Sequence, residues 1–290
     1  MPYRPGRHER SLMLHVVDRG SGPPVVLLHG QPGSASSWRP LIDQLEDGFR
    51  VLAPDRPGYG ATTDDGRGFD GNTDLVARMV RDAGCGPAIV VGHSWGGGVA
   101  LLLATDYPEL VRGLVLVGSI GTPDSINFLD RLLNVRVLGS VLTSAGLVGI
   151  GSLLPRMRRW SRVLPDGARE YVHATFPDEL LTDGVEGAWG RTKETFMTEQ
   201  VALVGELPRI TAVLPRITVP TAVVEGNWDV VVPPASARSL AAAIPGAELV
   251  PVPGVGHFVP RDAAPVLAAV IREIDHRAGR RPAGGVSSGR

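Results

Sequence analysis

Short runs of consecutive apolar, mostly β-branched residues recur along the chain. Six of them have the length of a strand, and each is followed at once by Gly, Pro or Asp: VVLLH (25–29), RVLAP (50–54), AIVV (88–91), GLVLV (113–117), TAVVE (221–225) and AELVPV (247–252). An uninterrupted apolar run suits a strand that is buried on both faces, as in a parallel sheet. The pattern therefore predicts a sheet of at least six buried strands.

The segments between these runs have the apolar spacing of helices. Five ranges are expected to be helical: 36–46, 73–83, 96–107, 234–244 and 262–277. Strands that alternate with helices predict the α/β class, with a doubly wound, mostly parallel sheet. SLMLHVVD (11–18) reaches the first run through the turn-rich GSGPP, which predicts an edge strand.

One long interval breaks the alternation. Between about Thr122 and Pro215 only helix-like segments interrupted by Gly and Pro occur, which predicts a helical insertion over one end of the sheet. The expected division is a core of residues 1–121 and 216–278 around an insertion of 122–215. Residues 279–290, rich in Gly, Ser and Arg, are expected to be a disordered tail.

The string GHSWGG (92–97) fits G-x-S-x-G, the turn that carries the nucleophile of many serine hydrolases. Such a turn needs a strand before the serine, a helix after it and small residues two positions either side. Ser94 has all of these in AIVV, the 96–107 helix, Gly92 and Gly96. The second match, GVSSG (285–289), has no strand before it and no room for a helix after it. Ser94 is therefore the candidate nucleophile.

Serine needs a neighbouring base, and that base needs a group to orient it. Among the seven histidines, His257 lies in a glycine-flanked loop after the last strand, where α/β proteins build their sites. The others are near the termini (His8, His276), on strands (His15, His29), in the insertion (His173) or inside the turn itself (His93). Asp229, directly after strand 221–225, is the preferred acid, and Asp124 is the rival.

With these motifs the chain resembles the α/β-hydrolase superfamily. The resemblance is carried by HGQPG (29–33), DRPGYG (55–60), GHSWGG (92–97), GNWDVVVP (226–233) and GVGHF (254–258), in the family's Ser…Asp…His order. It implies that Ser94, Asp229 and His257 form a catalytic triad, and that the insertion is the family's variable cap domain.

Acyl transfer also requires backbone N–H donors that already face the developing oxyanion. Trp95 follows the nucleophile and can offer its N–H from the start of the helix. The resemblance assigns the second donor to Gln31, the residue after His-Gly. Asp55, Arg56 and the glycines of DRPGYG are expected to stabilise a turn beside the site.

The branch of the superfamily is indicated less directly. HGQP with Trp after the nucleophile resembles epoxide hydrolases and haloalkane dehalogenases, which attack an alkyl carbon with an aspartate. Ser94 stands at that position here, and a serine ether has no carbonyl for water to attack. In dehalogenases the residues matching Gln31 and Trp95 hold halide through side-chain N–H groups. Here these two side chains are expected either to be a relic of that arrangement or to contact the substrate.

The expected reaction is therefore hydrolysis of a carboxylic ester or lactone. The string SWGG also resembles proline iminopeptidases, which need cap carboxylates for the substrate's ammonium group. Glu186, Glu194, Glu199 and Glu206 are available, although such charges usually form a solvated face. Hydrolysis of C–C bonds, perhydrolysis, and a ligand receptor or non-hydrolytic cyclase on the same fold remain alternatives.

The expected substrate is a small to medium, mostly apolar molecule. Aromatic residues of the insertion are the candidates to contact it: Phe128, Trp160, Phe176 and Trp189. Equally, these side chains could form the core of the cap.

Composition and charge further limit the partners and cofactors that the protein is expected to have. A net charge of −1 with scattered arginines predicts no nucleic-acid partner, and the single cysteine, Cys85, excludes an intrachain disulfide. The charge-free stretch 137–154 contains too many Gly, Ser and Thr residues for a membrane span. No metal or nucleotide motif is present, so no cofactor is expected. The expected protein is a cytoplasmic monomer or homodimer.

Overall fold

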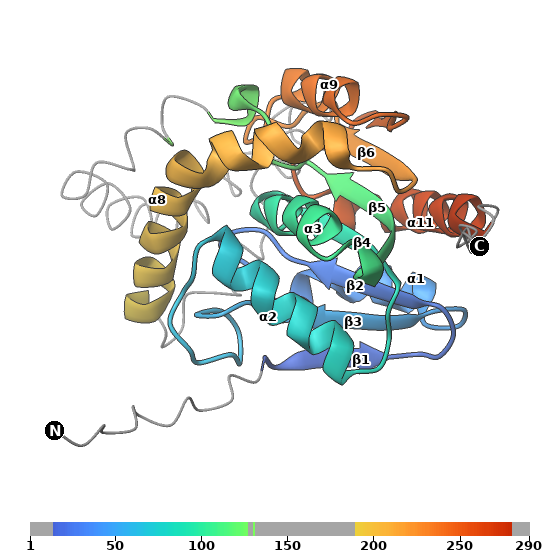
Figure 1. The fold of residues 1–290 in the computed structure, drawn as a ribbon, viewed down its shortest axis with the longest axis horizontal. Coiled ribbons are helices and arrows are strands. Elements are labelled where there is room, and N and C mark those ends of the chain that lie inside the picture. Colours follow the sequence, from blue (N-terminus) through green and yellow to red (C-terminus); the bar gives the residue numbers. More distant parts are fainter. Residues whose placement is uncertain (1–13, 127–129, 131–188, 280–290) are drawn as a thin grey trace, which may run out of the picture.

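The computed structural model of the chain describes residues 14–126, 130 and 189–279 (Figure 1). Most of the expected cap, including Phe128, Trp160 and Phe176, lies outside the described residues, as do the membrane-span candidate 137–154 and residues 280–290 of the expected tail. Among the described helices, none combines the length and the apolar character that crossing a bilayer would require.

Seven strands form one sheet in the order β1-β3-β2-β4-β5-β6-β7. Only β1 runs antiparallel to its neighbour, so the doubly wound, mostly parallel sheet and its edge strand are confirmed. The strands are β1 (Val16–Arg19), β2 (Pro24–Leu28), β3 (Arg50–Pro54), β4 (Ala88–His93), β5 (Val111–Val117), β6 (Thr221–Gly226) and β7 (Glu248–Val252).

The central strands are apolar at every position because both faces of the sheet are covered. In β2, Val26 and Leu28 belong to the core on one face, whereas Val25 and Leu27 belong to the core on the other. Side chains alternate between the faces of a strand, so each face receives every second residue. Full burial of each such side chain is worth about 1.5–3 kcal/mol.

The helices divide between the two faces as the alternation predicts (Figure 1). Residues of α2, α3, α8 and α9 line one core, and residues of α1 and α11 line the other. The helices are α1 (Arg39–Leu45), α2 (Phe69–Asp82), α3 (Trp95–Asp106), α8 (Trp189–Val213), α9 (Pro234–Ala243), α10 (Val259–Asp262) and α11 (Ala264–Gly279), with short 3-10 turns at η1 (Ala35–Trp38), η2 (Pro108–Leu110), η3 (Pro123–Ser125) and η4 (Leu214–Arg216).

Helix α8 is the described part of the expected insertion. It runs through 25 residues, contains Pro208 and bends along its length in Figure 1. Its C-terminal half does not stand apart from the sheet, because Leu203, Leu207 and Ile210 are buried in the core beside α3. The last part of the insertion is thus packed into the core that covers one face of the sheet.

The chain reverses its winding direction at β2. From β2 it passes to β3 on one side and later to β4 on the other, so β2 and β4 are neighbours. The loops that leave the carboxyl ends of β2 and β4 therefore meet at a topological switch point, where α/β proteins bind ligands. HGQPG and GHSWGG are these two loops.

Candidate functional site

Ser94 lies in a strained turn between β4 and α3. Its φ of 53° and ψ of −122° make it the one non-glycine residue with positive φ among the residues that the structure describes. The Ser94 N–H donates to the Val117 carbonyl at 2.9 Å, and its carbonyl accepts from the Gly97 N–H at 3.0 Å. Strain of this kind, held by surrounding hydrogen bonds, is found at functional positions.

The glycines around Ser94 are required by close backbone contacts. A methyl group on Gly96 would lie 2.4 Å from the Leu28 carbonyl oxygen, and one on Gly92 would lie 2.6 Å from Cα of Gly97. Neither distance leaves room for a side chain. These contacts explain physically why small residues flank the serine on both sides.

Asp229 and His257 are paired. Nδ1 of His257 lies 2.7 Å from Oδ2 of Asp229, and both side chains are buried. The other carboxylate oxygen of Asp229 accepts from the N–H groups of Val231 and Val232 at 2.8 and 2.9 Å. The carboxylate is therefore fixed, and its bond to Nδ1 directs Nε2 of the imidazole away from Asp229.

Two loops are tied together to create this pair. The Asn227 N–H donates to the carbonyl of Val252 and the Trp228 N–H donates to the carbonyl of Val255. The Asn227 side chain in turn accepts from the Gly254 N–H at 2.8 Å. The loop after β6 thus holds the loop after β7 in register, which brings residues 28 positions apart into contact.

The Asp229–His257 pair adjoins the turn that carries Ser94. His93, the residue before the serine, has Nε2 2.9 Å from the carbonyl oxygen of His257. A methyl group on Gly118, at the end of β5, would lie 3.1 Å from the Asp229 carboxylate and 3.2 Å from Nδ1 of His257. Ser94, His257 and Asp229 thus belong to three adjoining loops at the same sheet edge.

The rival acid lies elsewhere. Asp124 is exposed in η3, and its carboxylate accepts a hydrogen bond from the hydroxyl of Ser239 on α9 at 2.6 Å. The structure therefore pairs His257 with Asp229, the preferred acid.

The HGQPG loop passes beside the serine. A methyl group on Gly30 would lie 2.9 Å from Cβ of Ser94, so the loop approaches the turn at van der Waals distance. Gln31 follows, and its side-chain oxygen is buried without a hydrogen-bond partner in the described part of the chain. An unsatisfied buried amide oxygen in a loop that adjoins the candidate nucleophile is available for a contact with a ligand.

The Trp95 side chain has a structural partner that the sequence did not reveal. Its indole N–H donates to the backbone carbonyl of Glu199 on α8 at 3.3 Å, and its ring stacks on Phe69 with centroids 3.9 Å apart. The indole N–H is therefore engaged by α8. For Trp95 this anchoring contact is compatible with a relic and disfavours a substrate contact through the indole N–H, which leaves the backbone N–H as the group of interest.

The DRPGYG loop stabilises the surroundings of the site, as expected. The carboxylate of Asp55 accepts from the N–H groups of Ala35 and Ala61 at 2.7 and 2.9 Å, and it pairs with His15 at 2.9 Å. A methyl group on Gly60 would overlap this carboxylate at 2.3 Å, where the backbone also has a positive φ of 52°. Only glycine fits both requirements.

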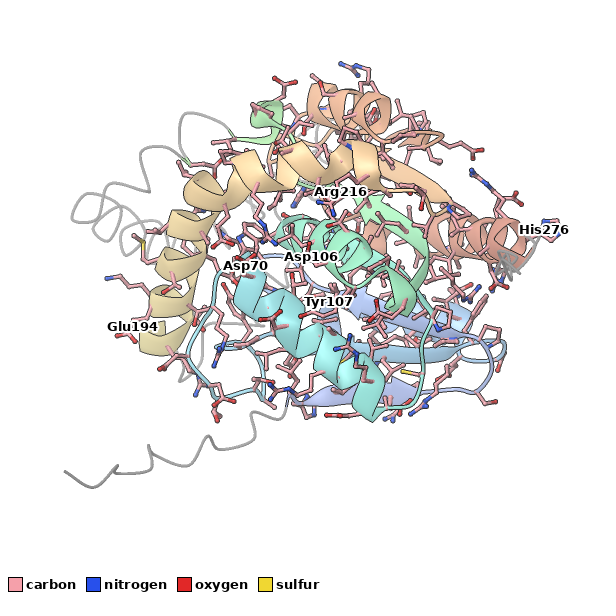
Figure 2. All side chains as sticks on the ribbon, in the orientation of Figure 1. Asp70, Asp106, Tyr107, Glu194, Arg216 and His276 are labelled. Carbon is pink, nitrogen blue, oxygen red and sulfur yellow. The ribbon has the colours of Figure 1, made fainter. Side chains whose placement is uncertain are left out.

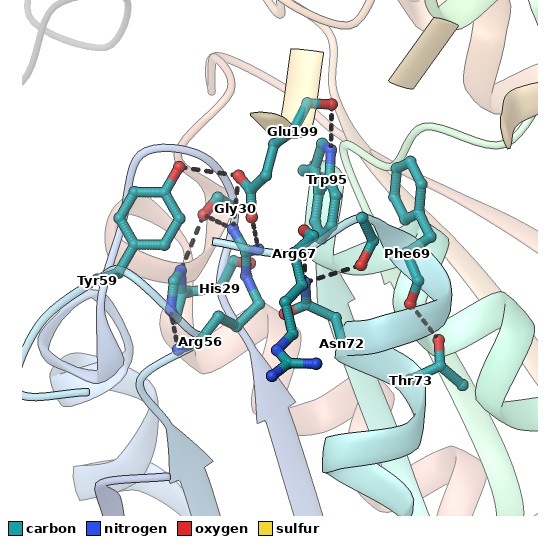
Figure 3. A network of polar contacts seen from close by, with 11 residues as sticks. His29, Gly30, Arg56, Tyr59, Arg67, Phe69, Asn72, Thr73, Trp95 and Glu199 are labelled. Atoms are coloured by element: carbon teal, nitrogen blue, oxygen red, sulfur yellow. Dashed lines mark hydrogen bonds and ion pairs between the residues drawn. The ribbon is translucent and has the colours of Figure 1, made fainter. Parts of the chain in front are cut away.

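A buried ion pair joins this loop to α8 (Figure 3). Arg56 and Glu199 form a salt bridge with both side chains fully buried, and the Tyr59 hydroxyl donates to Glu199 at 2.8 Å. Burial raises the pKa of Glu199 above its usual value, and the Arg56 charge opposes that rise. The expectation that the cap carboxylates form a solvated face is therefore wrong for Glu199, whose partner lies 143 residues away.

The remaining described cap carboxylates differ from Glu199. Glu194 is exposed and points outward in Figure 2, as expected of a solvated residue. Glu206 accepts from the Asp70 N–H at 3.3 Å, so it caps the first turn of α2. This contact helps to explain why α2 begins at Phe69 rather than at residue 73, the predicted start. Glu186 lies outside the described residues.

Within residues 14–126, 130 and 189–279, no three His, Cys, Asp or Glu side chains gather as a metal site would require. Of the four aromatic residues predicted to contact the substrate, only Trp189 falls in the described chain, as the first residue of α8.

Comparisons with known proteins agree with the fold. A family model described as the alpha/beta hydrolase family matches residues 25–270. An uncharacterized protein of Mycobacterium tuberculosis is 30% identical over 250 residues, 82% of this chain and 71% of that protein. Haloalkane dehalogenase 2 of M. tuberculosis is 27% identical over 266 residues, 90% of each chain. The chain therefore belongs to the alpha/beta hydrolase family.

A solved structure resembles the present one over nearly its whole length. A thermophilic esterase from Thermogutta terrifontis superposes with a TM-score of 0.68 at 25% identity, covering 91% of this chain and 93% of the esterase.

Proposed function

We propose that the protein is a serine hydrolase that cleaves a carboxylic ester or lactone of a small to medium, mostly apolar molecule. The observation that carries this proposal is the fixed, buried Asp229–His257 pair beside a serine in a strained strand-to-helix turn. That combination activates a hydroxyl for attack on a carbonyl carbon.

In the acylation step, Oγ of Ser94 attacks the carbonyl carbon while Nε2 of His257 takes the hydroxyl proton. The negative charge that forms on the carbonyl oxygen is stabilised by the N–H groups of Gln31 and Trp95. The intermediate collapses to an acyl-serine, and His257 returns its proton to the departing alkoxide, which leaves as an alcohol. The Asp229 carboxylate holds the tautomer of His257 and stabilises the transient imidazolium.

In the deacylation step, a water molecule loses its proton to Nε2 of His257 and attacks the acyl carbon. The second tetrahedral intermediate releases Oγ of Ser94, which regains the proton, and the carboxylic acid leaves. A lactone follows the same steps, except that its alcohol stays attached to the acyl group. Neither half of the reaction needs a metal or an organic cofactor.

The named function of one relative, a haloalkane dehalogenase, is not carried over. Displacement of halide would leave a serine ether at Ser94, which water cannot cleave by attack on a carbonyl. The aminopeptidase alternative is weakened because Glu199 is neutralised by Arg56 and Glu206 caps α2, so neither carboxylate is free for an ammonium group.

A fluorophosphonate probe tests the proposal, because only an activated serine reacts with it. We expect the purified protein to be labelled at Ser94 and to hydrolyse p-nitrophenyl butyrate or a γ-lactone in preference to proline p-nitroanilide. A folded protein that neither reacts with the probe nor hydrolyses any of these compounds would instead support a ligand receptor. Preferential release of p-nitroaniline would support the aminopeptidase.

A further inference from the structure

The peptide unit between Gly30 and Gln31 is held from one side by two hydrogen bonds (Figure 3). The Gly30 carbonyl oxygen accepts from Nη2 of Arg56 at 2.7 Å and from Nδ1 of His29 at 2.8 Å. In a planar trans peptide, the carbonyl of one residue and the N–H of the next point in opposite directions. The groups that fix the Gly30 carbonyl therefore also set the direction of the Gln31 N–H.

His29 is a neutral part of this support. Burial, followed by the nearby Arg56 cation, lowers the pKa of His29 well below its ordinary value. Its ring accepts the Arg56 backbone N–H at Nε2, at 2.9 Å, so the proton of the neutral ring lies on Nδ1 and faces the Gly30 carbonyl. His29 and the Arg56 backbone thus fix each other.

The Arg56 side chain is in turn fixed on every side. Its Nε donates to the His29 carbonyl at 3.0 Å, and its guanidinium lies 4.4 Å from the ring centroid of Trp95. Its remaining donors meet both carboxylate oxygens of Glu199, and the second of these contacts is 3.4 Å long. A planar guanidinium can hold a carboxylate and a carbonyl together, which the single ammonium of a lysine cannot do in the same geometry.

Stability alone does not account for this arrangement. Removing two charges from water costs about as much as their attraction returns, and apolar pairs of similar volume are often equally stable. A fully buried Arg–Glu pair that also binds the HGQPG loop therefore calls for a further role.

We propose that Arg56 and Glu199 are positioning residues for the oxyanion hole. Arg56 orients the Gly30–Gln31 peptide so that the Gln31 N–H faces the carbonyl oxygen of the substrate, and Glu199 holds Arg56 in that geometry. Because Glu199 is on α8, the hole is complete only when this helix is seated on the core. The inference rests on the proposed function, since an oxyanion forms only if Ser94 attacks a carbonyl.

The main test is the double variant Arg56→Met/Glu199→Met, which replaces the ion pair with an apolar pair of similar volume. We expect the variant to fold with a lowered melting temperature, because the His29 carbonyl and the Tyr59 hydroxyl lose buried partners. Its kcat for p-nitrophenyl butyrate should fall about 10²-fold per active serine. KM should stay within about twofold, because the lost interaction acts on charge that develops only in the transition state. Active serines are counted by labelling to completion with the fluorophosphonate.

A boronic acid supplies a readout independent of turnover. Butylboronic acid adds to a serine hydroxyl and places a boronate oxygen where the oxyanion would lie, so its inhibition constant should rise in parallel with the loss of kcat. A purely structural role would lower the number of labelled serines but leave both kcat per labelled serine and boronate affinity unchanged, which would overturn the proposal.

A single variant covers the case in which the double variant does not fold. Arg56→Lys keeps a cation beside Glu199 but loses the donor to Gly30, so we expect kcat and boronate affinity to fall while the protein stays folded. If this variant retains the kcat and the boronate affinity of the wild type, the positioning role is wrong. The matched control is Arg209→Met, which removes two exposed salt bridges from α8 to Asp70 and Asp106 and should leave kcat unchanged. Both aspartates are labelled in Figure 2.

The outcome for the wild type separates this inference from the proposed function. If the wild type is not labelled and does not hydrolyse the ester, the proposed function fails. If it is labelled and active while the Arg56 variants match it in kcat, only the positioning role fails.

Discussion

Nε2 of His93 and the backbone carbonyl oxygen of His257 are joined by a hydrogen bond of 2.9 Å. The carbonyl can only accept, so Nε2 of His93 carries the proton, and the residue before the candidate nucleophile thereby holds the loop of the candidate base. Burial lowers the pKa of His93 to about 3, so the ring is neutral and keeps this tautomer at physiological pH.

This bond predicts different effects for two substitutions of His93. His93→Gln places an amide N–H close to the former Nε2 position, so we expect kcat within a few-fold of the wild type. His93→Leu leaves the His257 carbonyl unpaired, and displacement of the base should lower kcat about 10- to 100-fold. Steady-state kinetics on p-nitrophenyl butyrate measures both, and equal losses in the two variants would contradict a role for the donor.

Replacement of the serine separates chemistry from folding. We expect Ser94→Ala to lower kcat by about 10⁴-fold or more and to abolish fluorophosphonate labelling. The melting temperature should not change, because alanine meets the same positive φ and the same Cβ contact beside Gly30 as serine does. Labelling that persists in this variant would place the reactive residue elsewhere.

The two aspartates should behave very differently. Asp229→Asn keeps an oxygen for the N–H groups of Val231 and Val232, but its amide meets Nδ1 of His257 and favours the wrong tautomer. A loss of about 10⁴-fold in kcat is expected with little loss of stability. Asp124→Asn is the control, since Asp124 is exposed and bonded to Ser239, and its kcat should stay within about twofold. The reverse result would make Asp124 the acid.

Much of the fold and the candidate site follows from local patterns in the sequence. The central strands are uninterrupted apolar runs because both sheet faces are covered, and their C-terminal ends are marked by Gly, Pro and Asp. The prediction of a buried strand is wrong for β7, which lies at the sheet edge and is mostly exposed. Ser94 is recognisable because its strained turn needs glycines at fixed spacing, and the candidates Asp229 and His257 follow strands of the same sheet. These features depend on a few adjacent residues, which a single sequence displays.

The features that the sequence did not reveal are contacts between distant segments. Glu199 has the appearance of one more charged residue on a polar helix, and only its burial against Arg56 distinguishes it. Likewise, the sequence alone suggests that the indole of Trp95 binds a ligand, whereas in the structure the indole N–H donates to the Glu199 carbonyl. Neither contact can be identified from the spacing of residues in the sequence, because both form only when α8 packs on the core.

The buried histidines predict how stability depends on pH. His93, with a pKa of about 3 in the fold against 6.5 as its ordinary value, binds fewer protons folded than unfolded between these values. Its contribution is therefore fully present above pH 6.5 and is lost as the pH falls toward 3, with a slope approaching about 1.4 kcal/mol per pH unit midway. His29, whose pKa is also depressed, acts in the same direction.

Glu199 acts in the opposite direction. Its pKa is raised above 4.5, so the folded state binds the extra proton, and its contribution is present below 4.5 and is lost as the pH rises through the folded value. Urea unfolding at several pH values should therefore give an unfolding free energy that falls as the pH is lowered below 6.5. Near pH 4.5 the fall should be less steep than His29 and His93 alone would cause, because Glu199 opposes it.

His93→Gln removes one ionisable group without removing the donor to His257, so its plot of unfolding free energy against pH should be flatter than that of the wild type below pH 6.5. Parallel curves for the two proteins would mean that His93 has the same pKa in the folded and unfolded states, so that burial does not keep its ring neutral at low pH.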